Sequence, residues 1–251
     1  MFVAGARRHR VTIQAGVVLG VIAFLFVASR INSFIPSPVA VFNAASDLAT
    51  GKELYWNLGV TLYEALVGLL IGTVLGVSLG VLAGSSRFAT EFFNPIILAL
   101  YSVPKIVFLP LLLMLFGVGL APKIANATLH AFFPVVLNSL VGMREVKLLH
   151  LKVARSMRAS PGQTVTKVFL PSMVLPVFAG IRLGLGLSVM GALLAELFQA
   201  NAGAGYLVHQ FYSKGLIGEM LVVIIVMFIL ILSINAGMKN IENRLSRWRA
   251  A

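Results

Sequence analysis

Charged residues are scarce in this 251-residue chain, and cysteine is absent. Charged side chains make up 11% of the residues and hydrophobic ones 59%, whereas about 25% of a typical soluble domain is charged. So few charges cannot cover the surface that a soluble protein of this length would need. The missing cysteines exclude disulfides and thiolate metal sites. Because charged residues are so few, we expect lipid, rather than water, to surround most of the chain.

Motifs for nucleotide hydrolysis and for metal binding are missing as well. The Gly-Lys pair Gly51-Lys52 lacks the remainder of a phosphate-binding Walker loop, so nucleotide hydrolysis by that route is excluded. The four histidines stand apart, without the spacing of a metal site. We also expect no pair of carboxylates inside the membrane that would perform acid–base chemistry. The chain is therefore predicted to be neither an enzyme nor a metal-binding protein.

The charges that remain are mostly basic, with 20 Lys and Arg residues against 8 Asp and Glu and a net charge of +12. Nucleic-acid binding would need a solvated basic surface. Here the basic residues stand in short blocks between long apolar runs. We therefore exclude nucleic acid as a partner.

Six apolar stretches are close in length to the roughly 20 residues that a helix needs to cross a bilayer. They predict an all-α integral membrane protein, a single transmembrane domain over residues 1–251 with about six spans, at residues 11–29, 62–84, 94–117, 122–142, 171–197 and 217–238. The first stretch follows a basic block, but it is longer than the apolar region of about 7–15 residues in a signal peptide. We therefore interpret it as a span.

Basic residues flank the spans mostly on the side of the N-terminus, and the other side holds only Arg30, Lys52, Lys123 and Lys214. Cytoplasmic loops of membrane proteins carry the excess of Lys and Arg. This distribution places the N-terminus in the cytoplasm, and an even number of spans places the C-terminus there too. The polar loop after the first span would then lie on the outer side.

Glycine recurs at every fourth residue of the predicted second span, at Gly68, Gly72, Gly76, Gly80 and Gly84. Small residues at this spacing let two helix backbones approach closely in lipid. Two interpretations stay open: close packing inside one subunit, or a contact or sliding surface between subunits.

Prolines stand in the third and fifth predicted spans, at Pro95, Pro104, Pro110, Pro171 and Pro176. A proline removes a backbone hydrogen bond, which a membrane helix tolerates where protein or water satisfies the freed groups. We expect both spans to be interrupted. Interrupted helices are common in transporters, so the prolines favour a protein that moves a solute.

Ionisable side chains inside the predicted spans are costly and are therefore candidates for function. Glu64 and Glu196 lie near the predicted outer ends of their helices, where they could reach lipid headgroups or water. Lys105, Arg182 and Glu196 are our candidates for the translocation path, and the two cations would suit an anionic solute. For Arg182, pairing with backbone carbonyls of a neighbouring helix is the alternative.

The segment between the fourth and fifth spans, residues 143–171, is long and basic. Connections between closely packed helices are usually short. Residues 148–160 have the apolar periodicity of a helix, which Pro161 and Gly162 interrupt. An ordinary basic loop is the alternative, but we predict a surface helix that binds a cytoplasmic partner.

This segment resembles the motif of binding-protein-dependent ABC permeases, which reads E-A-A, three residues, G, nine residues and I-x-L-P. Lys152, Val153 and Ala154 fall on E-A-A, Arg158 falls on the glycine, and Val168, Leu170 and Pro171 fall on I-x-L-P. Lys152 reverses a charge of the motif, and Arg158 replaces its glycine. The resemblance implies that residues 148–165 form a cytoplasmic coupling helix, with ATPase contacts from Lys152, Val153, Ala154, Arg155, Arg158, Ala159, Ser160, Pro161, Leu170 and Pro171.

Further motifs resemble the nitrate, sulfonate and taurine class of these permeases, over about residues 33–240. They are Ile35-Pro-Ser-Pro38, Pro104-Lys-Ile, Leu109-Pro110, Phe116-Gly-Val-Gly119, Ala195-Glu196, Asn201-Ala-Gly203 and Gly205-Tyr206. The class often has a basic residue early in its second span, where this chain has Glu64.

The resemblance implies the fold of a methionine-permease-like transmembrane domain in the bacterial inner membrane, and an importer completed by other chains. A second copy of this chain, a cytoplasmic ATPase dimer and a periplasmic or lipid-tethered substrate-binding protein would be its partners. ATP and Mg²⁺ would bind the ATPases, and this chain would hold no cofactor. The solute, and a paralogous permease in place of the second copy, stay open. The alternative function is a stand-alone secondary transporter or channel, which would need more intramembrane carboxylates or a pore lining.

Overall fold

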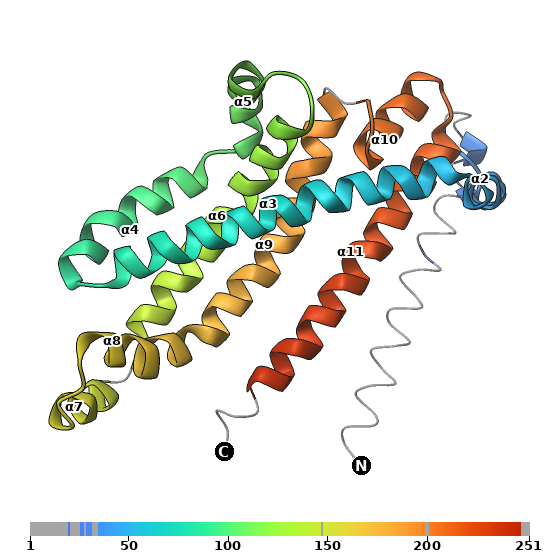
Figure 1. Ribbon diagram of the computed structural model, residues 1–251. Helices are drawn as coiled ribbons and strands as arrows, with labels where there is room; N and C mark the ends of the chain where they lie inside the picture. Colours follow the sequence, from blue (N-terminus) through green and yellow to red (C-terminus); the bar gives the residue numbers. More distant parts are fainter. Residues whose placement is uncertain are drawn as a thin grey trace, which may run out of the picture. The chain divides into compact units, whose positions relative to one another are not determined.

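The computed structural model describes residues 20, 26–27, 29–31, 35–146, 148–198 and 201–246, and their regular structure is helical throughout (Figure 1). The helices are α2 (Pro38–Thr50), α3 (Lys52–Gly84), α4 (Arg87–Ser102), the 3₁₀ turn η1 (Lys105–Phe108), α5 (Leu109–Phe116), α6 (Leu120–Arg144), α7 (Leu148–Ser156), α8 (Pro161–Thr164), the π-helical turn η2 (Val165–Phe169), α9 (Leu170–Phe198), α10 (Ala204–Ser213) and α11 (Ile217–Ser246). The predicted first span, residues 11–29, falls outside the described residues except for short pieces.

The chain divides into two compact units. The first comprises Met1–Tyr55 with Leu207–Val226, and the second comprises Trp56–Tyr206 with Met227–Ala251. Each candidate site described below lies within one unit. The single domain expected from the sequence stays a prediction.

Long apolar helices coincide with four of the predicted spans. The predicted residues 62–84, 122–142 and 217–238 lie within α3, α6 and α11, and α9 with the turns before it forms the helical stretch Gly162–Phe198. Each is long and apolar enough to cross a membrane. The predicted fold class, an all-α membrane protein, is confirmed.

The predicted third span, residues 94–117, is bent rather than straight. α4 and the following η1–α5 pair meet at an angle of 85°. A proline pushes the residue before it into an extended conformation, and Val103, before Pro104, has φ −71° and ψ 129°. This ends α4 at Ser102. The prediction of an interrupted helix is correct here.

The fifth span, in contrast, is not interrupted, and that expectation is wrong. α9 runs from Leu170 to Phe198 with Pro171 and Pro176 inside it. The helix accommodates Pro171 because the preceding turn is π-helical, and the Leu170 N–H donates to the carbonyl oxygen of Val165, five residues back. The backbone thus adapts in η2 instead of breaking.

The polar loop expected after the first span contains the helix α2. Pro38 is its first residue, and the Ser37 hydroxyl oxygen accepts a hydrogen bond from the Ala40 N–H at 3.2 Å. A serine cap followed by proline is a typical helix start. α2 ends beside Gly51, and α3 begins at Lys52.

α6 packs between α3 and α9 in the second unit. A Cβ placed on the glycines of the α3 stripe would come within 2.4–2.9 Å of α6, at Ala127, Ala131, Val135, Ser139 and Met143 in turn. On α9, Gly180, Gly184 and Gly191 approach α6 similarly, at 2.8–3.2 Å. Only residues without a side chain permit such approach. The stripe has the geometry that packing inside one subunit requires.

Candidate functional site

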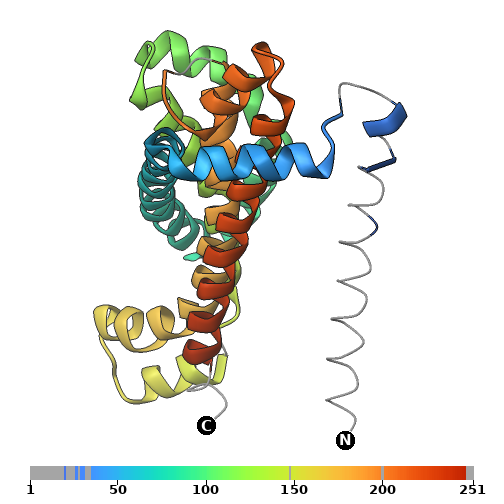
Figure 2. The ribbon, with the colours of Figure 1, turned by 90° about the vertical axis from the view of Figure 1, so that its right-hand side faces the viewer.

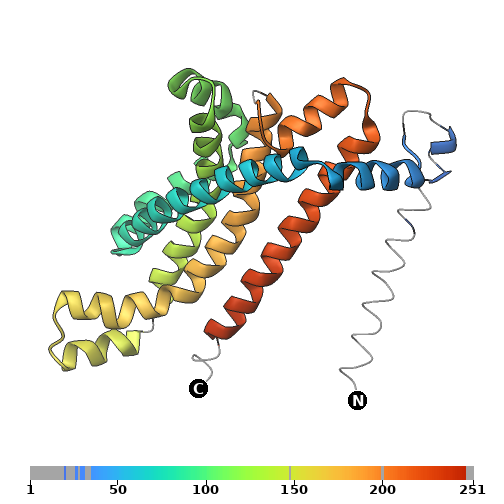
Figure 3. The ribbon, with the colours of Figure 1, turned by 45° about the vertical axis from the view of Figure 1, so that its right-hand side comes forward.

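The predicted coupling segment, residues 148–165, forms a helical hairpin. α7 and α8 are joined by a turn at residues 157–160, and η2 then leads into α9. Figures 2 and 3 show this hairpin at the end of the second unit opposite to α5. Pro161, predicted to interrupt a helix, begins α8.

Arg158 closes α7 in a left-handed conformation. Its φ of 52° is the one positive φ of a non-glycine residue in the described part of the chain. The Ala159 N–H donates to the Ala154 oxygen and the Arg158 N–H to the Arg155 oxygen, both at 3.0 Å, which are the two bonds of a Schellman motif. Glycine usually occupies this position because a Cβ is strained there. The glycine of the permease motif therefore has a conformational reason, and this chain places a strained arginine instead.

Ser160 begins the second helix of the hairpin. Its N–H donates to the Gln163 Oε1 at 2.9 Å, and its hydroxyl oxygen accepts from the Gln163 N–H at 3.3 Å. These reciprocal bonds form a capping box, and Pro161 occupies the favoured first helical position. The two caps fix the direction in which the chain leaves α7 and enters α9.

An apolar row follows one face of α7. Leu149, Val153 and Met157 are four residues apart and are 66%, 47% and 76% exposed. They line a hollow of about 480 Å³ whose other residues include Lys167 and Val168. Apolar groups this exposed, outside the candidate spans, are typical of a surface to which a partner binds.

Cations accompany this apolar row. Lys152, Arg155 and Arg158 are all exposed. The hairpin therefore offers apolar contact area next to positive charge, which is complementary to an acidic protein surface.

A second candidate site lies near the other end of α9, where three ionisable side chains are buried together. Glu64 of α3, Lys123 of α6 and Glu196 of α9 are 0%, 6% and 1% exposed. Lys123 Nζ lies 2.9 Å from Glu64 Oε1 and also donates to the backbone oxygen of Ala202 at 3.1 Å. At a rise of about 1.5 Å per residue, Glu196 is about 39 Å along α9 from Leu170.

Glu196 is held by donors from two directions. The Thr61 hydroxyl of α3 donates to Glu196 Oε1 at 2.7 Å and also lies 3.0 Å from Oε2. The Gly205 N–H donates to Oε2 at 2.7 Å. Hydrogen bonds of this kind stabilise a carboxyl group that has lost its water.

The loop at residues 201–205 is fastened to α3 through its backbone. The Gly203 N–H donates to Asn57 Oδ1 at 2.6 Å, and the Ala204 N–H donates to Thr61 Oγ1 at 2.8 Å. Gly203 has φ 117°, and a Cβ there would lie 2.2 Å from the Glu196 carboxyl carbon. Glycine is therefore required where the loop passes Glu196.

Two expectations about these glutamates are wrong. Both side chains are enclosed by protein, so neither reaches headgroups or water. A pair of carboxyl groups does exist within the candidate spans, since Glu64 and Glu196 are both buried and Thr61, one helical turn before Glu64 on α3, donates to Glu196. The role of Glu196 in the translocation path stays a prediction.

Lys123, Thr61 and Asn57 are site residues that sequence reasoning missed. Lys123 lies in α6, inside the predicted fourth span and not among the charges that flank it. That position was the available signal, because a lysine inside a span needs a partner. Thr61 and Asn57 had no signal, since nothing in the sequence indicates which loop they face.

Lys105 lies at the bend between α4 and α5. Its Nζ is 4.3 Å from the centroid of the Tyr101 ring and 4.9 Å from that of Phe133, and it donates to the Tyr101 backbone oxygen. Cation–π contacts thus hold a partly exposed ammonium group at a helix break. An ammonium group has three donors, so it can bind a further acceptor.

Arg182 pairs with a carboxylate instead of with backbone carbonyls. Its Nη1 lies 2.8 Å from Glu242 Oε2, and the two side chains are 30% and 25% exposed. This ion pair joins α9 to the C-terminal part of α11. A place for Arg182 in the translocation path stays a prediction.

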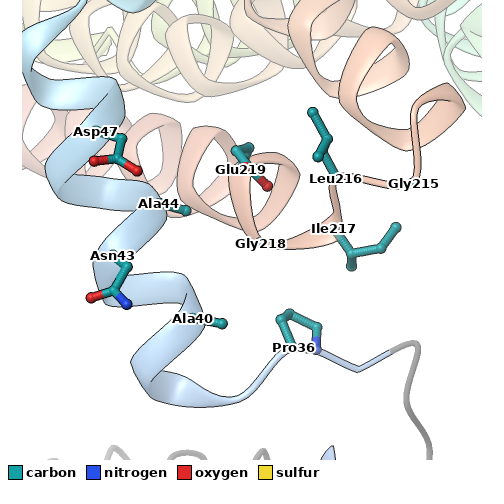
Figure 4. A pocket seen from close by; sticks show the side chains of 10 residues that line it. All are labelled: Pro36, Ala40, Asn43, Ala44, Asp47, Gly215, Leu216, Ile217, Gly218 and Glu219. Carbon is teal, nitrogen blue, oxygen red and sulfur yellow. The ribbon is translucent and has the colours of Figure 1, made fainter.

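In the first unit, a hollow of about 610 Å³ opens between α2 and the start of α11 (Figure 4). The carboxylates of Asp47 and Glu219 and the amide of Asn43 are among its lining groups. Gly215, with φ 72°, lets the chain turn into α11. Two carboxylates repel an anion, so we do not place an anionic solute here.

A family model matches residues 72–247 of the chain. Its description is "Binding-protein-dependent transport system inner membrane component". The match includes the hairpin and the loop at residues 201–205.

Three curated relatives are similar over most of their length. The putative aliphatic sulfonates transport permease protein SsuC of Bacillus subtilis (strain 168) is 31% identical, over 86% of this chain and 78% of that protein. The taurine transport system permease protein TauC of Escherichia coli (strain K12) is 28% identical, over 86% and 80%. The nitrate import permease protein NrtB of Synechocystis sp. (strain ATCC 27184 / PCC 6803 / Kazusa) is 27% identical, over 77% and 74%.

Solved structures share the fold. A chain of the MetNI methionine ABC transporter in an inward-facing conformation superposes with a TM-score of 0.61 at 23% identity, covering 78% of this chain and 95% of that one. A chain of an amino acid ABC transporter crystallised with histidines gives a TM-score of 0.66 at 15% identity, covering 79% and 97%.

Proposed function

Because the chain belongs to the family of binding-protein-dependent transport system inner membrane components, and within it to the ABC permeases of the nitrate, sulfonate and taurine class, we propose that it carries a small anionic solute into the cytoplasm across a bacterial inner membrane. The relatives' names give aliphatic sulfonates, nitrate and taurine. Nitrate is an anion, and sulfonates and taurine each carry a sulfonate group. In this chain, the positive charge of the Lys105 ammonium group supports the proposal that the solute is an anion.

The energy for transport comes from a separate ATPase that binds ATP and Mg²⁺. The hairpin at residues 148–165 carries this part of the proposal. Its exposed apolar row and its cations are suited to a groove on a soluble partner. The motif spacing from Lys152 to Pro171 supports the same role, with Val153, Ala154 and Ala159 close to the contact.

The hairpin is built to pass motion on to the membrane helices. Its two caps, at Arg158 and Ser160, leave little freedom between α7 and α8. η2 continues without a break into α9 through Leu170 and Pro171. A displacement of the hairpin by the ATPases therefore moves α9, which packs against α6 through glycines. Alternating access would follow from such movements in two permease subunits.

Two further partners complete the importer. A second copy of this chain would form the other half of the path, and a periplasmic or lipid-tethered binding protein would deliver the solute from the outer side. Both termini would lie in the cytoplasm, as the distribution of basic residues predicts.

Lys105 is the path residue that the geometry supports best. It lies at the bend of the α4–α5 pair, is partly exposed, and has donor capacity beyond its bond to Tyr101. Arg182 is less suited because Glu242 neutralises it. Glu196 is less suited because donors surround it.

Co-purification with the ATPase tests the coupling role of the hairpin. We expect Ala159→Glu to abolish recovery of the ATPase with the permease while the permease stays in the membrane, because an acidic side chain next to the cations disrupts both packing and charge complementarity. Ala49→Glu on α2 is the matched control, an exposed alanine outside the hairpin, and should leave recovery unchanged. Unchanged recovery of the ATPase with Ala159→Glu would show that the hairpin is not the contact.

A further inference from the structure

We propose that the buried cluster of Glu64, Lys123 and Glu196 is a proton-binding site, in which the two carboxyl groups share one exchangeable proton. The three side chains come from three helices, α3, α6 and α9, and each is at least nine-tenths buried. The proposal does not depend on the solute or on the ATPase, because it rests on geometry inside the second unit.

The first argument is the balance of charge. Lys123 supplies one positive charge, and two ionised carboxylates would supply two negative ones. Among the described residues, the buried Lys, Arg, Asp and Glu side chains are these three. A net charge buried among membrane helices is costly, and a buried carboxylate avoids that cost by taking up a proton. One proton makes the cluster neutral.

The second argument is the hydrogen-bond pattern. The Thr61 hydroxyl, one helical turn before Glu64 on α3, donates to Glu196, so the two carboxyl groups belong to one hydrogen-bonded cluster. An ionised carboxylate only accepts hydrogen bonds, so two carboxyl groups in such a cluster can bind to each other only if one of them carries a proton. Glu64 Oε2 is buried and has no partner for an ordinary hydrogen bond among the described residues. A shared proton would satisfy this oxygen, as buried polar atoms require.

A metal cation fits the cluster less well than a proton. Lys123 Nζ, 2.9 Å from Glu64 Oε1, already supplies the neighbouring positive charge. Hard cations take about six or more oxygen ligands, whereas Glu196 is surrounded by N–H and O–H donors. In the described part of the chain, no group of three or more His, Cys, Asp or Glu residues could hold a metal ion.

The proton-binding site is connected to the loop at residues 201–205. Lys123 donates to the Ala202 oxygen, and Glu196 accepts from the Gly205 N–H. The proton comes from water and returns to it, and only an O–H bond forms or breaks. Its loss leaves an excess negative charge beside the loop, so we expect the loop to loosen when the proton leaves.

Infrared spectroscopy of the full chain, in the assembly in which it purifies and returned to lipid, tests the proposal. A protonated carboxyl group has a C=O stretching band apart from the carboxylate bands, and the band shifts when water is exchanged for D₂O. We expect this band in the wild type and its loss in Glu64→Gln and in Glu196→Gln, because either change leaves one carboxylate to pair with Lys123. Glu91→Gln is the matched control and should keep the band, because Glu91 is exposed and pairs with Arg87.

A second variant changes the band in the opposite direction. In Lys123→Met no positive charge remains in the cluster, so both carboxyl groups should be protonated and the band should double. If this variant does not fold, the two glutamine variants still decide, since they keep the shape of the side chain. A wild type without the band, or a band unchanged in both glutamine variants, would overturn the proposal. A missing band together with sodium-dependent thermal stabilisation, lost in Glu64→Gln, would overturn it in favour of a cation site.

Discussion

The two ends of α9 hold charged side chains in opposite environments. Next to the N-terminal end, the hairpin exposes Lys152, Arg155 and Arg158 to water. Near the C-terminal end, Lys123 and its two glutamates are buried among helices. Water screens exposed charges, so losing one costs little, whereas a buried charge depends on its partner. The comparison teaches that the same residue types hold helices together where they are buried and, as we propose, bind another protein where they are exposed.

The same substitution at the two ends gives the largest expected contrast. Lys123→Met should lower the free energy of unfolding by about 3–5 kcal/mol, because the buried carboxyl groups lose their counter-charge and must take up a second proton. Lys152→Met, at an exposed lysine of the hairpin, should leave the stability almost unchanged. Unfolding of both variants in detergent, followed by circular dichroism, measures the difference.

A second substitution sharpens this result. Lys123→Met combined with Glu64→Gln leaves one buried carboxyl group to be protonated instead of two, so the double variant should be more stable than Lys123→Met alone. Equal stability of Lys123→Met and Lys152→Met would show that the buried ion pair is not important for the fold.

A smaller effect is expected where the loop at residues 201–205 passes the buried cluster. Gly203→Ala should cost about 2–3 kcal/mol, because the added Cβ overlaps the Glu196 carboxyl group and the φ of 117° is unfavourable. Gly117→Ala is the control: its φ is 72° but nothing lies within 4 Å, so it should cost only about 1–2 kcal/mol. Thermal unfolding of the two variants compares them, and an equal loss would contradict the contact with Glu196.

The smallest effect is expected in the hairpin and has the opposite sign. Arg158→Gly should stabilise α7 by about 0.5–1 kcal/mol, because the left-handed strain that it removes is larger than the cost of the flexibility that glycine adds to the unfolded chain. Arg155→Gly removes the same charge inside α7 and should destabilise the helix by about 1 kcal/mol. Hydrogen exchange of the α7 amides distinguishes the two variants, because it should be slower in Arg158→Gly than in Arg155→Gly. Equally fast exchange in both variants would argue against a strained cap at Arg158.

Elements that depend on local sequence were predictable, and contacts between distant elements were not. The length of the apolar stretches predicted four long helices, because a helix must match the thickness of the bilayer. Pro104 predicted the bend, because a proline restricts the residue just before it. The apolar periodicity predicted a helix in residues 148–160, but not the turn after Ser156 or the second helix that begins at Pro161. The buried cluster escaped because Thr61 and Glu196 are 135 residues apart, and no periodicity indicates which helix faces which. Glu64 stands where permeases of this class often carry a basic residue, and this difference supplies one of the two carboxyl groups of the pair.

The energy source of transport is the most direct test of the account. The permease would be reconstituted into liposomes with the ATPase encoded beside it and with its binding protein, and uptake of a radiolabelled sulfonate or nitrate analogue would be measured. We predict uptake that requires ATP and all three components, and that is lost with Ala159→Glu but kept with Ala49→Glu. Uptake by the permease alone, driven by an ion gradient without ATP, would contradict the account.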